Sequence, residues 1–292
     1  MDQFKTYLID DGLCPKTAVR YAKVAAKYVL WLKENNLNVE KVKRNQFTDW
    51  LQTFREQGLK QRTIDGKESV IFHFYCFLGT PSNPALGWIS RKDEHKLPPP
   101  PIERNELIEL YRHLRPKTLV DYRNRCMLGF ILFQGLKRIE LEELRIGDVN
   151  FETGKMFVRK QRKSNLRWLD LETVQALHLQ EYFKKHRKKL LRNKAADTGK
   201  FFLTFRKSAS MDSVFSELLK EVRKFNPQIK DLYHIRTSVI SYWLNEYGLM
   251  EAMIRAGHKN INTTKRYETK KYDELYELLK TAHPMEQADF IV

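Results

Sequence analysis

The chain of 292 residues has few cysteines and no long hydrophobic run. Its three cysteines (Cys14, Cys76 and Cys126) lie far apart and form no C-x-x-C pair. This argues against a disulfide scaffold and against a thiolate zinc site. No stretch approaches the ~18 consecutive apolar residues of a membrane span, and Met1-Asp2-Gln3 does not begin a signal peptide. We therefore expect a protein without a membrane segment, in a reducing, cytoplasmic compartment.

Acidic side chains are scarce relative to basic ones. The chain has 53 Lys and Arg against 36 Asp and Glu, a formal net charge of +17. Such an excess predicts a polyanionic partner, and the commonest large polyanion of a cytoplasm is nucleic acid. Residues 1–100 hold 16 basic and 11 acidic side chains and the remainder holds 37 and 25, so both parts can contact it. At 42% hydrophobic residues, the chain can also bury a sizeable core.

A run of four prolines, Pro98–Pro101, divides the chain, because proline fits neither a helix interior nor a paired strand. Before it, apolar residues recur at helical spacing, and helices are predicted after Pro15, over Arg44–Gln57 and over Gln61–Phe77. We therefore predict a helical domain over residues 1–94, a proline-rich linker over 95–104 and a second domain over 105–292.

The second domain mixes helices with a small sheet. Short runs rich in β-branched or aromatic residues, separated by turn residues, predict strands over Asp148–Phe151, Lys155–Arg159 and Arg167–Leu171. Helical spacing predicts the other elements, which are Glu103–Leu114, Val120–Leu132, Glu140–Arg145, Glu172–Leu191, Ser210–Lys224, Thr237–Tyr247, Leu249–Ala256 and Asp273–Thr281. The expected fold class is mainly α with a small antiparallel β-sheet.

The predicted hairpin concentrates positive charge. Its cations are Arg159, Lys160, Arg162, Lys163 and Arg167. So many cations on a short β-turn-β unit repel one another unless an anion is nearby, and each phosphate that they neutralise releases counterions. We therefore expect the hairpin to contact nucleic acid phosphates.

Three short segments of the last third follow one another in a distinctive order. They are Tyr233-His234-Ile235-Arg236, Ala256-Gly257-His258 and Thr264-Lys265-Arg266-Tyr267. This order resembles the catalytic half of the tyrosine recombinases, or phage-type integrases, in which a buried Arg begins a helix, a Leu/Ala-Gly-His turn follows, and a Tyr lies nine residues after that His. Together with Trp243-Leu244 and His283-Pro284, the segments most resemble integrases of mobile elements in Bacteroidetes-type bacteria.

The resemblance extends over essentially the whole chain. The segment from Gly135 to Leu141 resembles the surroundings of the family's first arginine, and the basic hairpin resembles the turn that presents its lysine. The helical first hundred residues, with Thr17 and Tyr21, resemble its DNA-clamping domain. The resemblance thus implies a helical N-terminal DNA-clamping domain followed by an α+β tyrosine-recombinase catalytic domain.

The resemblance also implies a role for each site residue. Tyr267 is the expected nucleophile, Arg236 the expected phosphate clamp, and His258 would donate to a phosphate oxygen or manage the nucleophile's proton. Lys163 is the candidate general acid for the leaving 5′-oxygen, with Lys160 as its rival. Because a phosphotyrosyl link stores the bond energy, rejoining needs no metal, ATP or other cofactor, and the chain has no G-x-x-x-x-G-K-[ST] loop.

The sequence departs from the family pattern at two places. The family's first arginine falls on Lys137, and an arginine follows at Arg138; one step along a helix turns a side chain by about 100°, so both cannot face one phosphate. Arg138 is slightly favoured because its fork suits phosphate better than an ammonium does. The family usually has His three residues before its second arginine, where this chain has Tyr233 with His234 beside it; either could contact the phosphate.

The resemblance implies a site-specific DNA recombinase that cleaves and rejoins strands through a covalent 3′-phosphotyrosyl intermediate. Its expected partners are double-stranded DNA with specific recombination sites, three further copies in a homotetramer on paired sites and, in some reactions, an accessory DNA-bending protein. The expected location is the bacterial cytoplasm, at the nucleoid. The alternatives are a recombinase-derived DNA-binding protein without cleavage activity, a type IB topoisomerase relative and an unrelated RNA-binding protein.

Overall fold

The computed structural model describes residues 1–87, 99–162, 164–192, 197–205 and 210–268. Backbone contacts divide the chain into two compact units, Met1–Lys96 and Leu97–Val292. Within the described ranges, no helix combines the length and the apolar character needed to cross a bilayer.

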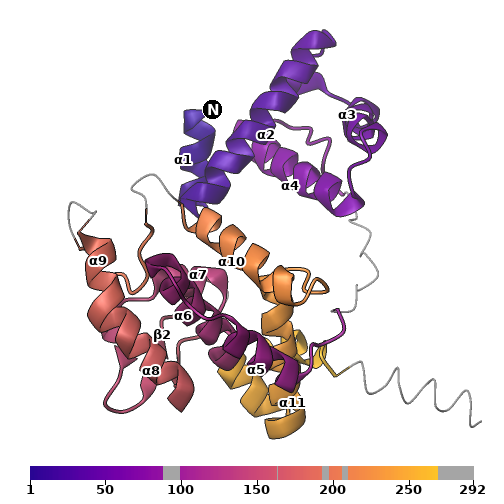
Figure 1. Cartoon of the computed structure of the whole chain (residues 1–292). Coiled ribbons are helices and arrows are strands. Elements are labelled where there is room, and N and C mark those ends of the chain that lie inside the picture. Colours follow the sequence, from indigo (N-terminus) through magenta and orange to yellow (C-terminus); the bar gives the residue numbers. More distant parts are fainter. Residues whose placement is uncertain (88–98, 163, 193–196, 206–209, 269–292) are drawn as a thin grey trace, which may run out of the picture. The chain divides into compact units, whose positions relative to one another are not determined.

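The first unit is helical, and its longest helix begins at a proline. Its elements are α1 (Asp2–Asp10), α2 (Pro15–Glu34), the short 3-10 helix η1 (Val39–Lys41), α3 (Arg44–Glu56) and α4 (Gln61–Leu78). Pro15 is at the first position of α2, where the missing N–H costs nothing. Helices α1 and α4 pack on α2, and α3 packs on α4 (Figure 1). The predictions for α3 and α4 are confirmed, whereas α1 was not predicted.

Aromatic side chains fill the core of this unit. Tyr28, Phe47, Trp50 and Tyr75 are all buried, and their rings meet at centroid distances of 4.8 to 6.3 Å. The hydroxyl oxygens of Tyr28 and Tyr75 lie 3.2 Å apart, and Tyr75 also donates to the carbonyl of Val39 at 2.9 Å. Since a buried hydroxyl needs a partner, this pair allows two tyrosines to lie in an otherwise apolar core.

The second unit is built around helix α6 (Leu119–Gln134), which is buried on nearly every side. Helices α5, α8, α10 and α11 contact α6 (Figure 1). The helices of this unit are α5 (Arg104–His113), α6, α7 (Arg138–Glu143), the 3-10 helix η2 (Ile146–Asp148), α8 (Thr173–Glu181), the π-helix η3 (Tyr182–Arg187), α9 (Lys188–Leu191), α10 (Met211–Phe225), α11 (Leu232–Ala256) and α12 (Ile261–Lys265).

Three strands form the expected antiparallel sheet in the order β1 (Val149–Asn150), β2 (Lys155–Val158) and β3 (Arg167–Asp170). Met156 pairs with Leu169, and both side chains are buried on the face that meets the core. Beyond the paired strands, a bridge between Gln161 and Ser164 extends the β2–β3 hairpin. The predicted fold class, mainly α with a small antiparallel sheet, is confirmed.

Two predicted helices begin more than one residue earlier than expected. Helix α11 begins at Leu232 rather than Thr237, because the Asp231 carboxylate accepts the N–H of His234 at 2.7 Å and caps the helix. The predicted interruption is confirmed at Gly248, whose φ of 78° is not helical. Helix α7 begins at Arg138 rather than Glu140, since the Glu140 carboxylate accepts the N–H of Lys137. The predicted helix Asp273–Thr281 lies outside the described residues.

Candidate active site

Arg236 lies in the first turns of α11 with only 1% of its surface exposed. Its guanidinium donates to the carbonyl of Gly135, at the end of α6, and to that of Ala256, at the end of α11, the latter at 2.7 Å. Burial lowers the pKa of Arg236 to about 10, and the charge of Glu140 opposes this shift. The side chain is therefore a cation at neutral pH, held in place by two backbone carbonyls.

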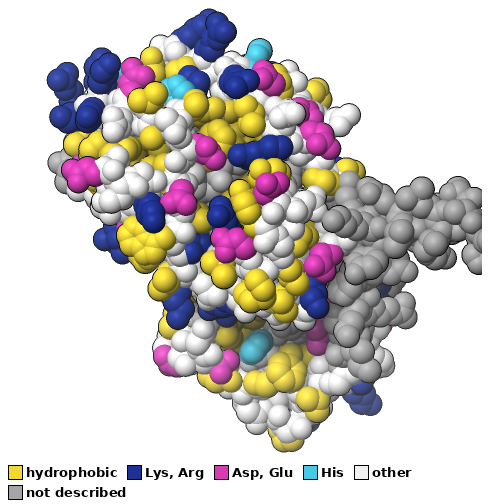
Figure 2. Space-filling model, turned by 90° about the horizontal axis from the view of Figure 1, so that it is seen from below, with side chains coloured by type: hydrophobic (Ala, Val, Ile, Leu, Met, Phe, Trp, Pro, Cys, Tyr) yellow, Lys and Arg dark blue, Asp and Glu magenta, His cyan; other side chains and the backbone are white. Residues whose placement is uncertain are grey.

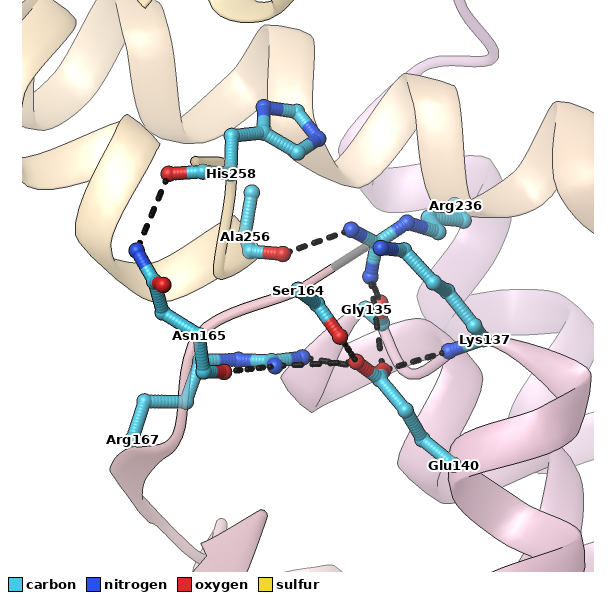
Figure 3. A network of polar contacts seen from close by, with 9 residues as sticks. All are labelled: Gly135, Lys137, Glu140, Ser164, Asn165, Arg167, Arg236, Ala256 and His258. Carbon is cyan, nitrogen blue, oxygen red and sulfur yellow. Dashed lines mark hydrogen bonds and ion pairs between the residues drawn. The ribbon is translucent and has the colours of Figure 1, made fainter. Parts of the chain in front are cut away.

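The Glu140 carboxylate neutralises this buried positive charge. It lies 3.9 Å from Arg236 and accepts both terminal nitrogens of Arg167 at 3.0 Å (Figure 3). It also accepts the hydroxyl of Ser164 at 3.0 Å. Burial acts to raise the pKa of Glu140, but the hydrogen bonds and charge of Arg167, with the charge of Arg236, lower it to about 2. The carboxylate therefore stays ionised.

The β2–β3 hairpin is attached to the turn that ends α11. Asn165 donates its backbone N–H to the carbonyl of Gly257 at 3.0 Å and its side-chain amide to that of His258 at 3.4 Å (Figure 3). Gly257 has a φ of +68°, and a Cβ there would lie 2.5 Å from Nη1 of Arg167. Only glycine suits both this backbone conformation and this space. The absence of a side chain at Gly257 therefore allows the hairpin to pack closely against the His258 turn.

His258 is buried and neutral. Its Nδ1 lies 2.8 Å from the hydroxyl of Thr264 in α12, a contact in which either group can donate. Burial, with the charges of Arg236, Lys137 and Arg167, lowers the pKa of His258 to about 3. At neutral pH it can donate one ring N–H to an oxygen, but it is not a cation.

Tyr267 follows α12 and is half-buried. Its hydroxyl oxygen lies 3.3 Å from that of Tyr233 in α11. Burial and the hydrogen bond with Tyr233 raise the pKa of Tyr267, and the charges of Arg236 and Arg266 oppose this rise without cancelling it. The phenol therefore needs help to lose its proton before it can act as a nucleophile, because the neighbouring cations do not cancel the effect of burial.

Of the two adjacent candidates for the first arginine, Lys137 faces the cluster. Figure 3 shows its side chain extending to the side on which Arg236 lies, and its charge contributes to the lowered pKa of His258. Arg138 points elsewhere, because it pairs with Asp212 at 2.5 Å and stacks over Phe215 of α10. The preference for Arg138 is thus corrected in favour of Lys137.

Two further expectations are corrected by the hydrogen bonds that these side chains already make. Arg167 is buried, and both of its terminal nitrogens are bonded to Glu140, so the structure gives it a partner inside the protein rather than a place on the surface of the hairpin. His234 is also buried: one ring nitrogen accepts the N–H of Lys230 at 3.3 Å, and the other lies 2.8 Å from the carbonyl of Pro100. Both ring nitrogens of His234 are thus engaged away from Tyr267, and Tyr233 takes the place beside the nucleophile candidate.

The other hairpin cations lie on the surface. Lys160 and Arg162 are exposed, and Arg159 pairs with Asp148 at 2.7 Å while about half of its side chain remains exposed. Lys163 lies outside the described residues. On the face drawn in Figure 2, Lys and Arg side chains gather along one edge, while the remainder mixes both signs of charge with hydrophobic groups.

The most connected residue of the site, Glu140, was not predicted to take part in it. It is a glutamate three residues after Lys137, a position typical of a helix cap, and nothing local indicates that its partner is Arg167, 27 positions away. Thr264 and Asn165 were likewise seen only as parts of connecting segments. Within the described ranges, no three His, Cys, Asp or Glu side chains converge as metal ligands would.

Fold and site together define a protein class. A profile of the Phage integrase family matches residues 101–274, and the phage integrase N-terminal SAM-like domain matches residues 1–80. The chain therefore belongs to the phage integrase family. The sequence-based interpretation as a tyrosine-type site-specific DNA recombinase is confirmed.

The similarity to individual relatives covers most of the chain. Tyrosine recombinase XerC of Oceanobacillus iheyensis is 26% identical and covers 97% of this chain and 95% of its own. XerC of Halalkalibacterium halodurans is 29% identical over 80% of each chain. Among solved structures, the XerH recombinase bound to palindromic difH substrate has a TM-score of 0.67 at 16% identity, covering 93% of this chain and 80% of its own. The Tn1549 transposon integrase with transposon right end DNA has a TM-score of 0.64 at 17% identity, covering 96% and 98%. At such identities the structural likeness concerns the fold.

Proposed function

We propose that this recombinase cleaves and rejoins duplex DNA at specific sites through Tyr267. The observation that supports it most is the convergence of Arg236, His258 and Tyr267, which come from three separate segments. Arg236 is buried and fixed by the carbonyls of Gly135 and Ala256, so it needs little reorganisation when a phosphate arrives. Its remaining N–H groups are suited to the non-bridging oxygens of a scissile phosphate.

Other groups would complete the phosphate site. His258 donates a ring N–H, and Lys137 supplies the positive charge at the place of the family's first arginine. Lys137 is a point charge without a fork, so it gives less directional binding than an arginine would. Lys163 and Lys160 stay open as candidates for the acid that protonates the leaving 5′-oxygen. Exposed Lys160, Arg162 and Arg159 would bind flanking phosphates.

In the cleavage step, the Tyr267 oxygen bonds to phosphorus as the bond from phosphorus to the 5′-oxygen breaks. The products are a 3′-phosphotyrosyl link and a free 5′-hydroxyl. Attack of that hydroxyl on the link reverses the step, so the chemistry needs no ATP or metal. Because burial raises the pKa of Tyr267, the removal of its proton is the step that most needs assistance from other groups of the protein.

Several finer features belong to the same proposal. Double-stranded recombination sites are the proposed substrate, which is supported by two solved structures of similar fold: the XerH recombinase bound to palindromic difH substrate and the Tn1549 integrase in complex with transposon right end DNA. We further propose a homotetramer on paired sites, an accessory DNA-bending protein in some reactions, and a place at the nucleoid in the bacterial cytoplasm. The order of the C-terminal motifs supports a mobile element of a Bacteroidetes-type bacterium as the source.

A nicked suicide substrate tests the function. Such DNA loses a short fragment on cleavage, so the covalent adduct cannot be reversed and is counted on a denaturing gel. Wild type should accumulate adduct, and Tyr267→Phe should give none, a loss beyond ~10⁴-fold, because the nucleophile is absent. Tyr247→Phe is the matched control, since Tyr247 is an exposed tyrosine on the same helix as Arg236.

The same gel separates the proposal from its alternative. DNA binding by wild type without any adduct would support the cleavage-free DNA-binding protein instead. Adduct formed at the wild-type rate by Tyr267→Phe would contradict Tyr267 as the nucleophile. Relaxation of a supercoiled plasmid that lacks the site would favour a topoisomerase.

A further inference from the structure

We propose that Tyr233 is a further catalytic residue, whose hydroxyl receives the proton of Tyr267 during attack and passes its own proton to solvent. This inference rests on the proposed function, because it assigns the first proton transfer of that reaction. It concerns a position where this chain departs from the family pattern, which usually has His there.

The geometry places the two hydroxyl groups in contact. Their oxygens lie 3.3 Å apart, although the residues are 34 positions apart in the sequence. This is long for a bond between hydroxyls, as catalytic hydrogen bonds often are before the substrate arrives. Helix α11 begins at Leu232, so Tyr233 is anchored in the same helical turn as Arg236, which is fixed by two carbonyls.

The two tyrosines differ in their access to water. Tyr233 is 56% exposed, whereas Tyr267 is half-buried and packs against the core cluster of the second unit. A proton that leaves Tyr267 therefore has a direct path to solvent through the Tyr233 hydroxyl. Since a hydroxyl can accept one proton while it donates another, this relay places no lasting charge on Tyr233.

The neighbouring groups are poor acceptors of this proton. Among the described residues, Arg236, Arg266 and Tyr233 influence the protonation of Tyr267, and the two arginines are cations. The pKa of His258 is lowered to about 3, so its imidazole is a weak base. The Glu140 carboxylate is occupied by Arg167 and Ser164. The charges of Arg236 and Arg266 would in turn stabilise the phenolate as it forms.

The step balances as follows. The Tyr267 hydroxyl gives its proton to the Tyr233 oxygen, while Tyr233 gives its proton to water or a buffer base. The Tyr267 oxygen bonds to phosphorus, the bond to the 5′-oxygen breaks, and that oxygen takes a proton from the separate leaving-group acid. No electron is transferred to or from a cofactor.

Single-turnover cleavage of two nicked substrates tests the relay. One substrate has the natural 5′-oxygen, and the other has sulfur in that bridging position, which leaves as a thiolate without needing an acid. Tyr233→Phe removes one exposed oxygen and should slow adduct formation about 10²-fold on both substrates. Tyr247→Phe, on the same helix, should match wild type on both. Tyr233→His, which restores a group able to relay a proton, should recover much of the rate.

Each outcome decides one question. If wild type forms no adduct on either substrate, the proposed function fails, and the relay fails with it. If wild type forms adduct and Tyr233→Phe equals it, the relay alone is overturned. If the sulfur substrate restores Tyr233→Phe, then Tyr233 serves the leaving group, and the relay is likewise overturned. Binding of the intact duplex, measured by anisotropy, should be unchanged in Tyr233→Phe, and a matching loss of affinity would overturn a role in proton transfer.

Discussion

The two units of this chain differ in the kinds of side chain that they bury. In the described part of the first unit, the fully buried side chains are apolar or aromatic, and the hydroxyl pair of Tyr28 and Tyr75 supplies the polar contact inside. The second unit buries several charged side chains, among them Arg123, Glu140, Arg167 and Arg236. The buried charges of the second unit must therefore be neutralised by partners of opposite charge or by hydrogen bonds, which the apolar interior of the first unit does not require.

The proposed function accounts for this difference. Replacing a buried ion pair with apolar residues of similar volume is often neutral or stabilising, so Glu140 and its arginines are not explained by stability. A guanidinium that must meet a phosphate in a fixed position, however, has to be desolvated and oriented in advance. Under the proposed function, this costly interior serves to position Arg236 and His258 for a phosphate, and the described residues of the first unit have no corresponding site.

Glu140→Gln should have the largest effect, and that effect should be confined to the second unit. The amide keeps the shape but removes the charge, leaving Arg167 and Arg236 buried without a counter-ion. We expect a loss of about 3–5 kcal/mol in the free energy of unfolding of the second unit. Hydrogen exchange followed by mass spectrometry in the full chain would report each unit separately. The first unit should keep its protection.

Glu142→Gln is the matched control, on the same helix and half-buried. It should cost less than about 1 kcal/mol, because Glu142 is partly open to solvent and is in no ion pair that the structure shows among the described residues. Equal effects of the two substitutions would contradict the view that the buried carboxylate neutralises the site.

A pair of glycine substitutions tests whether the second unit is the more sensitive of the two to an added methyl group. Gly257 and Gly58 both have positive φ, +68° and +72°, but a Cβ at Gly58 meets nothing within 4 Å. Gly58→Ala should cost only the backbone penalty of about 1–2 kcal/mol. Gly257→Ala adds a clash with Nη1 of Arg167, which cannot yield because both of its terminal nitrogens are bonded to Glu140.

Gly257→Ala should therefore lower the thermal stability more than Gly58→Ala does. It should also slow adduct formation on the nicked substrate about 10²-fold, because it displaces the His258 turn. Gly58→Ala should form adduct at the wild-type rate. A Gly257→Ala protein with normal cleavage would show that the hairpin and the His258 turn tolerate separation.

The same contrast explains what the sequence could and could not predict. Helices α3 and α4 were predicted to within a residue because their apolar spacing and the following glycines are local signals. The order of Arg236, His258 and Tyr267 was visible because each lies in a short motif. The partner of Glu140 was not visible, since the pairing with Arg167 depends on how the hairpin folds onto α7. Arg138 was preferred over Lys137 on chemistry alone, and only the cap at the start of α7 decides which side chain faces inward.

The smallest expected effect is an opposite response of the two units to pH. Burial and the charge of Asp65 raise the pKa of Glu68, in the first unit, from 4.5 to about 7. The folded state then holds a proton that the unfolded state releases, so this contribution is present below pH 4.5 and is lost as pH rises through about 7. In the second unit, the pKa of His258 is lowered from 6.5 to about 3, so its contribution is present above pH 6.5 and is lost as pH falls toward 3. Between pH 5 and pH 6.5, the contributions of Glu68 and His258 to the free energy of unfolding therefore change with pH in opposite directions.

Hydrogen exchange at pH 5 and at pH 6.5 tests this in wild type, Glu68→Gln and His258→Asn. The difference between wild type and each variant isolates the contribution of the substituted residue. Differences of the same sign in both units would contradict the assignment, and because Glu68 is partly exposed, its term should be the weaker one.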